Sequence, residues 1–147
     1  MGLPPHCCRI VTLITMIKRK PRYVIKRTAI GLGFFTLVPI PNDKKIIEYI
    51  GLILTKEEAD KKGGKYLMTI DEEYLIDGSP RSNIARYINH SCQPNAKAYN
   101  TGLRVWIWSL RAIKAGEEIT IDYGKNYFED FINPVGCKCA KCVENLK

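Results

Sequence analysis

Three short motifs, in a fixed order along the second half of the chain, constrain its fold more than any other feature. Residues 86–95 read RYINHSCQPN, residues 116–124 read GEEITIDYG, and residues 137–142 read CKCAKC. Each motif alone has an ordinary explanation, such as a capped turn for the first and a half-exposed strand for the second. All three occur together in 147 residues, which restricts the chain to folds that use all of them.

The composition is that of one globular domain with a basic surface. A length of 147 residues, 46% hydrophobic and 26% charged, suits a single core. The formal net charge of +8 favours an acidic partner such as nucleic acid or a nucleoprotein. Many small proteins are basic without such a partner, so the charge alone leaves both interpretations open.

Residues 1–20 read as an extension outside the fold. Residues 10–17 are an apolar run, far shorter than the roughly 20 residues of a membrane-spanning helix. The basic residues 18–20 follow this run, whereas a signal peptide carries its charge before it. They are either a solvated cluster or a nuclear or nucleic-acid contact, and Met16 is an alternative start. We expect no membrane association.

Short apolar runs punctuated by Gly, Pro and Asn predict a mostly-β domain with few short helices. A capping box at residues 55–58 predicts a helix that ends near Lys62, and residues 82–88 predict a helical turn capped by Ser82 or Asn83. Glycines at residues 31–33 should separate the first two strands. Strands are expected over residues 23–26, 34–37, 45–54, 65–70, 73–76, 96–99, 103–110 and 118–123.

The three motifs together resemble those of SET-domain protein-lysine N-methyltransferases that carry a short post-SET zinc tail. The resemblance implies several small curled sheets with a pseudoknot, in which the first motif threads beneath the second. It implies a SET domain at residues 21–130 and a post-SET tail at residues 131–147. The implied activity is transfer of a methyl group from S-adenosylmethionine to a lysine of a histone or other basic protein.

The same resemblance implies which residues hold the methyl donor. Asn89 and His90 would hold it, since an Asn amide and nearby backbone groups can satisfy its polar ends. Arg86 is a candidate for the donor's carboxylate, because a guanidinium pairs with carboxylates bidentately, although a structural ion pair is the alternative. The other implied contacts are Gly31, Leu32, Gly33, Phe34, Tyr123 and Phe128. Phe34 has a second interpretation, as a core residue.

Three tyrosines are implied on the lysine side. Tyr123 is the expected central catalytic residue, whose hydroxyl holds geometry near the methyl group. Tyr66 would line the lysine channel, and Tyr127 would limit the product to mono- or dimethylation. A free lysine has a pKa near 10.4 and must lose its proton before it attacks. No dedicated general base is apparent, so we expect that proton to leave through water and positioning to carry most of the rate.

The cysteines point to a reducing compartment and to zinc. Three of the six lie close together near the C-terminus, as metal ligands do, whereas a disulfide framework is spread along the chain. Cys137, Cys139 and Cys142, with Cys92 as the fourth ligand, would make a closed tetrahedral site. The spacing is shorter than is usual for a post-SET tail. Free or disulfide-bonded thiols are the alternative.

Two other functions fit parts of the sequence. One is a catalytically inactive SET-like module, and the presence of Asn89, His90 and Tyr123 argues against it. The other is a basic zinc-containing module that binds nucleic acid. The lack of a second CxxC pair and of an aromatic–basic stripe argues against that one. We expect an intracellular protein, at the nucleus or chromosome in a eukaryote and otherwise in the cytoplasm or delivered to a host cell.

Overall fold

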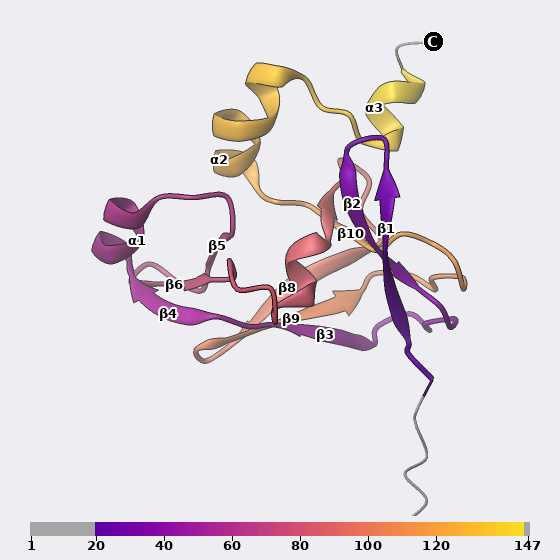
Figure 1. Cartoon of the computed structure of the whole chain (residues 1–147), viewed down its shortest axis with the longest axis horizontal. Coiled ribbons are helices and arrows are strands. Elements are labelled where there is room, and N and C mark those ends of the chain that lie inside the picture. The colour runs from indigo at the N-terminus through magenta and orange to yellow at the C-terminus, as the bar shows by residue number, and fades with distance from the viewer. Residues whose placement is uncertain (1–19, 146–147) are drawn as a thin grey trace, which may run out of the picture.

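The computed structural model describes residues 20–145, which form several small β-sheets and a few short helices (Figure 1). The strands pair as β1 (Tyr23–Thr28) with β2 (Gly31–Thr36); β3 (Lys45–Tyr49), β9 (Arg104–Ser109) and β8 (Ala96–Thr101) in that order; β4 (Leu52–Thr55), β6 (Tyr74–Asp77) and β5 (Leu67–Thr69) in that order; and β7 (Asn89–His90) with β10 (Thr120–Ile121). The expected fold class is confirmed. The apolar run at residues 10–17 lies outside the described residues.

The single strand expected over residues 45–54 is two strands in different sheets. The break lies at Ile50 and Gly51, where the N–H of Ile50 donates to the Asn83 side chain at 3.2 Å. A Cβ on Gly51 would stand 2.0 Å from the carbonyl oxygen of Asp77, so the chain can change sheets here only with glycine. Strand β3 therefore pairs with β9, and β4 pairs with β6.

The turn between the first two strands lies before residues 31–33, where the glycines had predicted it. Strand β1 ends at Thr28 and β2 begins at Gly31. In the turn between them, the side chain of Thr28 accepts the N–H of Ile30 at 3.2 Å. Gly31 has a φ of 123°, and Gly33 lies inside β2. The glycines thus serve the turn and a close backbone contact, and do not interrupt the strand.

Helix α1 (Lys56–Lys62) begins with the predicted capping box. The Thr55 hydroxyl accepts the Glu58 N–H, and the Glu58 carboxylate accepts the Thr55 N–H at 2.9 Å. The expected turn at residues 82–88 is a 3₁₀ helix, η1 (Ile84–Tyr87), whose preceding Asn83 bonds to other segments and does not cap it. The C-terminal segment contains α2 (Lys125–Tyr127), the π-helix η2 (Phe128–Ile132), η3 (Asn133–Val135) and α3 (Ala140–Glu144).

The hydrophobic core lies between the β1–β2 hairpin and the inner face of the β3–β9–β8 sheet. Phe34 is fully buried and stacks on Tyr23 with ring centroids 4.9 Å apart. Ile107, Ile113 and Ile119 are equally enclosed. Burial of side chains of this size contributes roughly 1.5–3 kcal/mol each. The core fixes the hairpin against the segment that leads into β10.

Strands β7 and β10 form a parallel pair that joins the two central motifs. Asn89 lies opposite Thr120 and His90 opposite Ile121. Asn95 extends this pairing with its side chain, which donates to the Glu118 carbonyl at 2.7 Å and accepts the Thr120 N–H at 2.9 Å. The two segments that the resemblance predicted to meet, residues 86–92 and 116–124, are thus paired. Within residues 20–145, no helix is long and apolar enough to span a bilayer.

Candidate active site and cysteine cluster

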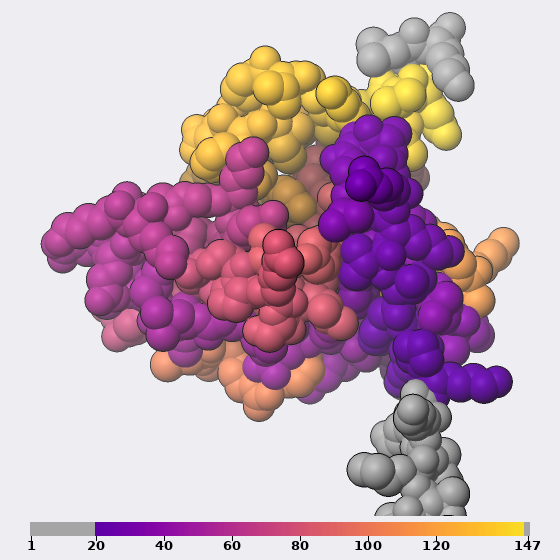
Figure 2. Space-filling view, viewed as in Figure 1, coloured from indigo at the N-terminus to yellow at the C-terminus, as the bar shows by residue number. Residues whose placement is uncertain are grey.

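Two adjoining cavities open beside the β7–β10 pair. The larger measures about 1120 Å³ and the smaller about 410 Å³. Asn89, Tyr123 and Tyr127 line both cavities, so these residues stand where the two meet. Figure 2 shows the hollow between the β1–β2 hairpin, the α1–β5 segment and the C-terminal helices. The arrangement allows two molecules to approach one point from different sides.

Tyr123 is held rigidly at this junction. Its hydroxyl donates to the carbonyl of Ile88 at 2.6 Å, and its backbone N–H donates to Nδ1 of His90 at 3.2 Å. Burial raises the pKa of Tyr123, so the phenol stays protonated at neutral pH. Because its proton is engaged by Ile88, the lone pairs of the oxygen can face a bound group.

His90 connects the junction to the cysteine cluster. Burial lowers the pKa of His90 in spite of the nearby Asp122 carboxylate, which raises it. Since Nδ1 accepts the N–H of Tyr123, the neutral ring carries its proton on Nε2. That nitrogen lies 3.4 Å from Sγ of Cys92. The imidazole is thus oriented from both sides.

Asn89 fastens the first motif to the hairpin and to Glu118. Its amide nitrogen donates to the Leu32 carbonyl at 3.0 Å and to Oε1 of Glu118 at 2.8 Å. A Cβ on Gly33 would stand 2.4 Å from that same oxygen, so glycine is needed for this approach. Glu118 positions Asn89 without lining either cavity, a contact that the sequence reasoning missed although Glu118 lies within the second motif.

Arg86 and Tyr66 pack together on the wall of the larger cavity. The Arg86 guanidinium lies 4.0 Å from the centre of the Tyr66 ring and donates to the carbonyl of Ser79. Its Nε is buried and has no hydrogen-bond partner among the described residues. A buried donor without a partner is costly, and because protein atoms enclose this nitrogen, a ligand in the cavity does not reach it.

Aromatic residues of the C-terminal segment form one wall of the two cavities. Tyr127 packs edge-on against Tyr123 with ring centroids 4.9 Å apart, and its hydroxyl donates to the Lys65 carbonyl at 3.3 Å. Phe131 follows one turn later, 4.7 Å from Tyr127. Phe128 contacts the ring of His90 at 5.4 Å.

The expected site residues therefore fall into groups. Brought together around the two cavities are Leu32, Tyr66, Arg86, Asn89, His90, Tyr123 and Tyr127. Phe34 is in the core and Gly33 is buried beneath Glu118. Gly31 forms the turn, and Phe128 reaches the group through His90.

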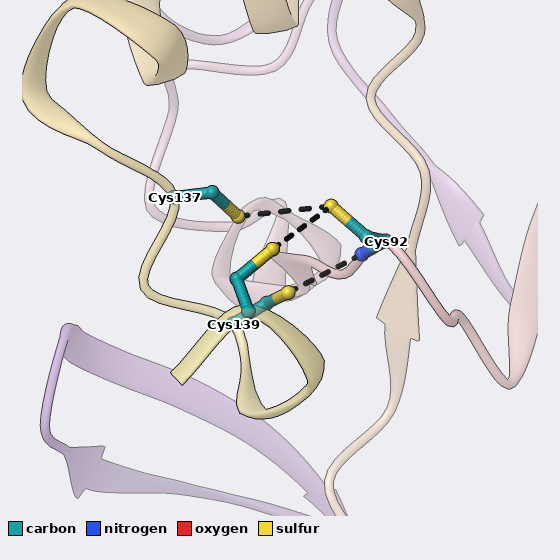
Figure 3. Close-up of side chains that lie close together, drawn as sticks. Cys92, Cys137 and Cys139 are labelled. Atoms are coloured by element: carbon teal, nitrogen blue, oxygen red, sulfur yellow. Dashed lines mark hydrogen bonds between the residues drawn. The ribbon is translucent and has the colours of Figure 1, made fainter. Parts of the chain in front are cut away.

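The four expected cysteines converge from two distant segments, as Figure 3 shows for Cys92, Cys137 and Cys139. All four Sγ atoms lie within 4.8 Å of one another. Cys92 is 3.8 Å from Cys137 and 3.7 Å from Cys142. Thiolates in a tetrahedral zinc site, with Zn–S near 2.3 Å, stand about 3.8 Å apart. The donor set fits zinc, and the N–H of Cys92 donates to Sγ of Cys139 at 3.5 Å.

Comparison with known proteins identifies the family. Residues 31–124 match the SET domain family. This chain belongs to the SET-domain family. The chain is 35% identical, over 92% of its length, to histone-lysine N-methyltransferase set1 of Dictyostelium discoideum. It is 41% identical over 75% of the chain to histone-lysine N-methyltransferase set-2 of Caenorhabditis elegans. It is 32% identical over 85% of the chain to histone-lysine N-methyltransferase SUV39H1 of Xenopus laevis.

These relatives are much longer proteins. The matched part covers 10% of the Dictyostelium protein, 8% of the Caenorhabditis protein and 33% of the Xenopus protein. The similarity therefore concerns the SET domain and its immediate surroundings.

Proposed function

We propose that this SET domain is an S-adenosylmethionine-dependent protein-lysine N-methyltransferase. The observation that carries the proposal is the meeting of two cavities at a buried, oriented Tyr123. A methyl transfer between two large molecules needs such an arrangement, because donor and acceptor must approach one point from opposite sides. The names of the three relatives, all histone-lysine N-methyltransferases, support the same activity.

Asn89, His90 and the Leu32–Gly33 backbone would hold the donor. The positions of Asn89, which lines both cavities, and of His90, which lines the smaller one, support this fit. Gly31 and Phe128 would border the same site, and Phe34 would support it from the core. When bound, S-adenosylmethionine supplies a methyl group on a positively charged sulfur.

The lysine would enter along Tyr66 and Tyr127. Aromatic walls stabilise a cationic methylated product through their ring faces, while burial in an apolar channel favours the neutral amine that must attack. The oxygen of the Tyr123 hydroxyl would orient the lysine amine and the methyl group for in-line transfer. Because burial keeps this phenol protonated, it acts by position and polarity, and the lysine proton leaves through water.

Substrate and location follow from the relatives and remain proposals. We propose a histone tail or another basic protein as substrate, mono- or dimethylation as the product, and a nuclear or chromosomal location in a eukaryotic host. Residues 21–130 would form the catalytic domain and residues 131–147 the tail. The presence of Asn89, His90 and Tyr123 supports an active enzyme over the catalytically inactive alternative.

We also propose structural zinc at Cys92, Cys137, Cys139 and Cys142. The sulfur separations and the N–H donors from Cys92 and His90 support it. Oriented second-layer donors of this kind are typical of thiolate metal sites. The metal would fix residues 137–142 beside the first motif and so complete the wall of the smaller cavity, which Cys137 and Cys139 line.

Label transfer from radioactive S-adenosylmethionine to histones and to other basic proteins tests the activity. We expect label on a lysine with the native chain and label reduced about a hundredfold or more with Tyr123→Phe. Tyr99→Phe, a tyrosine outside both cavities, serves as the matched control. Label that appears equally with Tyr123→Phe would overturn the assignment, as would a chain that binds no S-adenosylmethionine in a direct titration.

A further inference from the structure

The outer face of the β3–β9–β8 sheet carries an aromatic and basic surface that the proposed methyl transfer does not use. Three aromatic residues, Tyr99, Trp106 and Trp108, lie on it, and Tyr99 meets Trp108 edge-on with ring centroids 6.0 Å apart. Tyr99 is 41% exposed, and both tryptophans are partly exposed. We name these three residues, with Lys45, Lys97 and Arg104, the outer sheet face.

Strand register places these residues on one side. Trp106 and Trp108 alternate with the buried Val105 and Ile107 along β9. Tyr99 lies opposite Trp106, and Lys97 opposite Trp108. Directly opposed residues of antiparallel strands share a face, so the six side chains point away from the core.

A β-bulge in β3 completes the surface. The register shifts between Lys45 and Ile47, so that Lys45 is opposite Trp108 and Glu48 is opposite Trp106. Three positions apart in a regular strand, Lys45 and Glu48 would point to opposite sides. The extra residue turns both toward the aromatic face.

The cations of this face lie directly over its rings. Nζ of Lys45 is 4.0 Å from the Trp106 ring centre, and Nζ of Lys97 is 4.1 Å from the Tyr99 ring centre. The guanidinium of Arg104 lies 4.9 Å from Trp106. Glu48 binds Arg104 through two hydrogen bonds of 2.6 and 2.7 Å. Lys45 and Lys97 therefore leave the face with a net positive charge, as does the chain, at +8.

We propose that the outer sheet face binds single-stranded nucleic acid. Unpaired bases stack on exposed aromatic rings, and Lys and Arg beside those rings neutralise the phosphates. Lys45 and Lys97 have flexible stems, so they can leave the rings for phosphate oxygens as bases take their place. Three rings on adjacent strands offer positions for successive bases, which a duplex cannot use because its bases are already stacked.

The opposite side of the same sheet faces the cleft. Ala98 lines the larger cavity, while its neighbours Lys97 and Tyr99 belong to the outer sheet face. The two sites are thus on opposite sides of one sheet. Figure 1 shows the strands of this sheet, β3, β9 and β8, in the lower part of the molecule. Nucleic acid bound there would leave the cleft open, and the proposal does not depend on the methyltransferase activity.

Tryptophan fluorescence tests the proposal directly, because Trp106 and Trp108 are the two tryptophans of the chain. Oligo(U) and oligo(dT) titrated into the full chain should quench the emission. The logarithm of the binding constant should fall linearly with the logarithm of salt, with a slope of about −0.7 for each phosphate neutralised. A duplex of equal length should bind more weakly, and polyglutamate should leave the emission unchanged.

Matched variants distinguish binding at the outer sheet face from nonspecific attraction to a positively charged protein. Lys97→Glu and Tyr99→Ala should each weaken oligo(U) binding about tenfold. Lys56→Glu, the same charge reversal at an exposed position on α1, should weaken it by no more than about twofold. Absence of quenching, equal losses for Lys97→Glu and Lys56→Glu, or equal binding of polyglutamate would overturn the proposal. The circular dichroism spectrum should be the same in all three variants, which confirms that each is folded.

Discussion

The hydroxyl of Tyr123 and the carbonyl of Ile88 are joined by a hydrogen bond of 2.6 Å. Ile88 precedes β7, and Tyr123 follows β10, so this bond ties the start of β7 to the segment just after its parallel partner β10. The same tyrosine is bound through its N–H to His90. Two contacts to the first motif thus fix Tyr123, so the orientation of the phenol depends on the pairing of β7 with β10.

We expect Tyr123→Phe to lower the rate of methyl transfer by about a hundredfold or more, the effect of losing one oriented polar group at a reacting centre. The ring remains, so the packing against Tyr127 should persist and S-adenosylmethionine should bind with a similar Kd. Single-turnover rates and calorimetric titration measure the two quantities. A variant that keeps its rate would show that the hydroxyl is not used.

The rate should rise with pH without a descending limb from Tyr123. Burial raises the pKa of this phenol, so it remains protonated through the range in which a lysine, with a pKa near 10.4, begins to lose its proton. Increasing pH therefore supplies more neutral amine and leaves the tyrosine unchanged. Rates at saturating donor between about pH 7 and pH 10 check this. A maximum near pH 9 would mean that a group in the site ionises earlier.

The hydroxyl of Tyr127 should limit the number of methyl groups added. Tyr127 packs beside Tyr123, and its hydroxyl donates to the Lys65 carbonyl at 3.3 Å, so the hydroxyl would occupy space beside the lysine in the proposed channel. Tyr127→Phe removes that oxygen and keeps the ring, so we expect a shift toward higher methylation. Mass spectra of the product measure the distribution. The same distribution from both proteins would exclude this role.

Removal of zinc should open the smaller cavity. Without the proposed zinc, the four sulfurs would lose the ion that they coordinate, and metal binding contributes folding free energy to the segment that holds the metal. We expect a chelator to release one zinc per chain and to weaken S-adenosylmethionine binding. Cys142→Ser should behave the same way. A chain that contains no zinc after purification in its presence would contradict the proposed site.

Local signals in the sequence predicted local structure well. The Thr55–Glu58 capping box depends on four consecutive residues, and it formed as expected. The four cysteines also came together as expected, although Cys92 is far from the others, because a known pattern supplied the long-range pairing. Neither inference required knowledge of how the strands are registered.

The features that the sequence did not predict depend on how the strands are aligned with one another. The change of sheet at Gly51 is caused by the carbonyl of Asp77, which arrives from another strand. The outer sheet face was missed as an aromatic–basic stripe because its members come from three strands and its alignment requires a bulge at Lys45. Along the chain, Lys45 and Lys97 are too far apart to be read together.

Acid should destabilise the fold partly through Asp77. Asp77 is only 5% exposed. Its Oδ2 forms an ion pair with Nζ of Lys62 at 2.6 Å, and its Oδ1 accepts the Ser79 N–H at 3.0 Å. Burial opposes its ionisation, but the bonds from Lys62 and Ser79 outweigh that effect and lower its pKa.

A lowered pKa means that the unfolded chain binds the proton first as pH falls. The stabilisation by Asp77 is therefore complete above the unfolded value, about 3.9, and is lost as pH falls below it through the folded value. We expect Asp77→Asn to unfold more easily at pH 7 and to lose part of the native decline in stability below about pH 4. Urea unfolding at several pH values measures both, with Asp60→Asn on the exposed side of α1 as the control. Parallel pH profiles for Asp77→Asn and the native chain would show that this carboxylate does not control the acid transition.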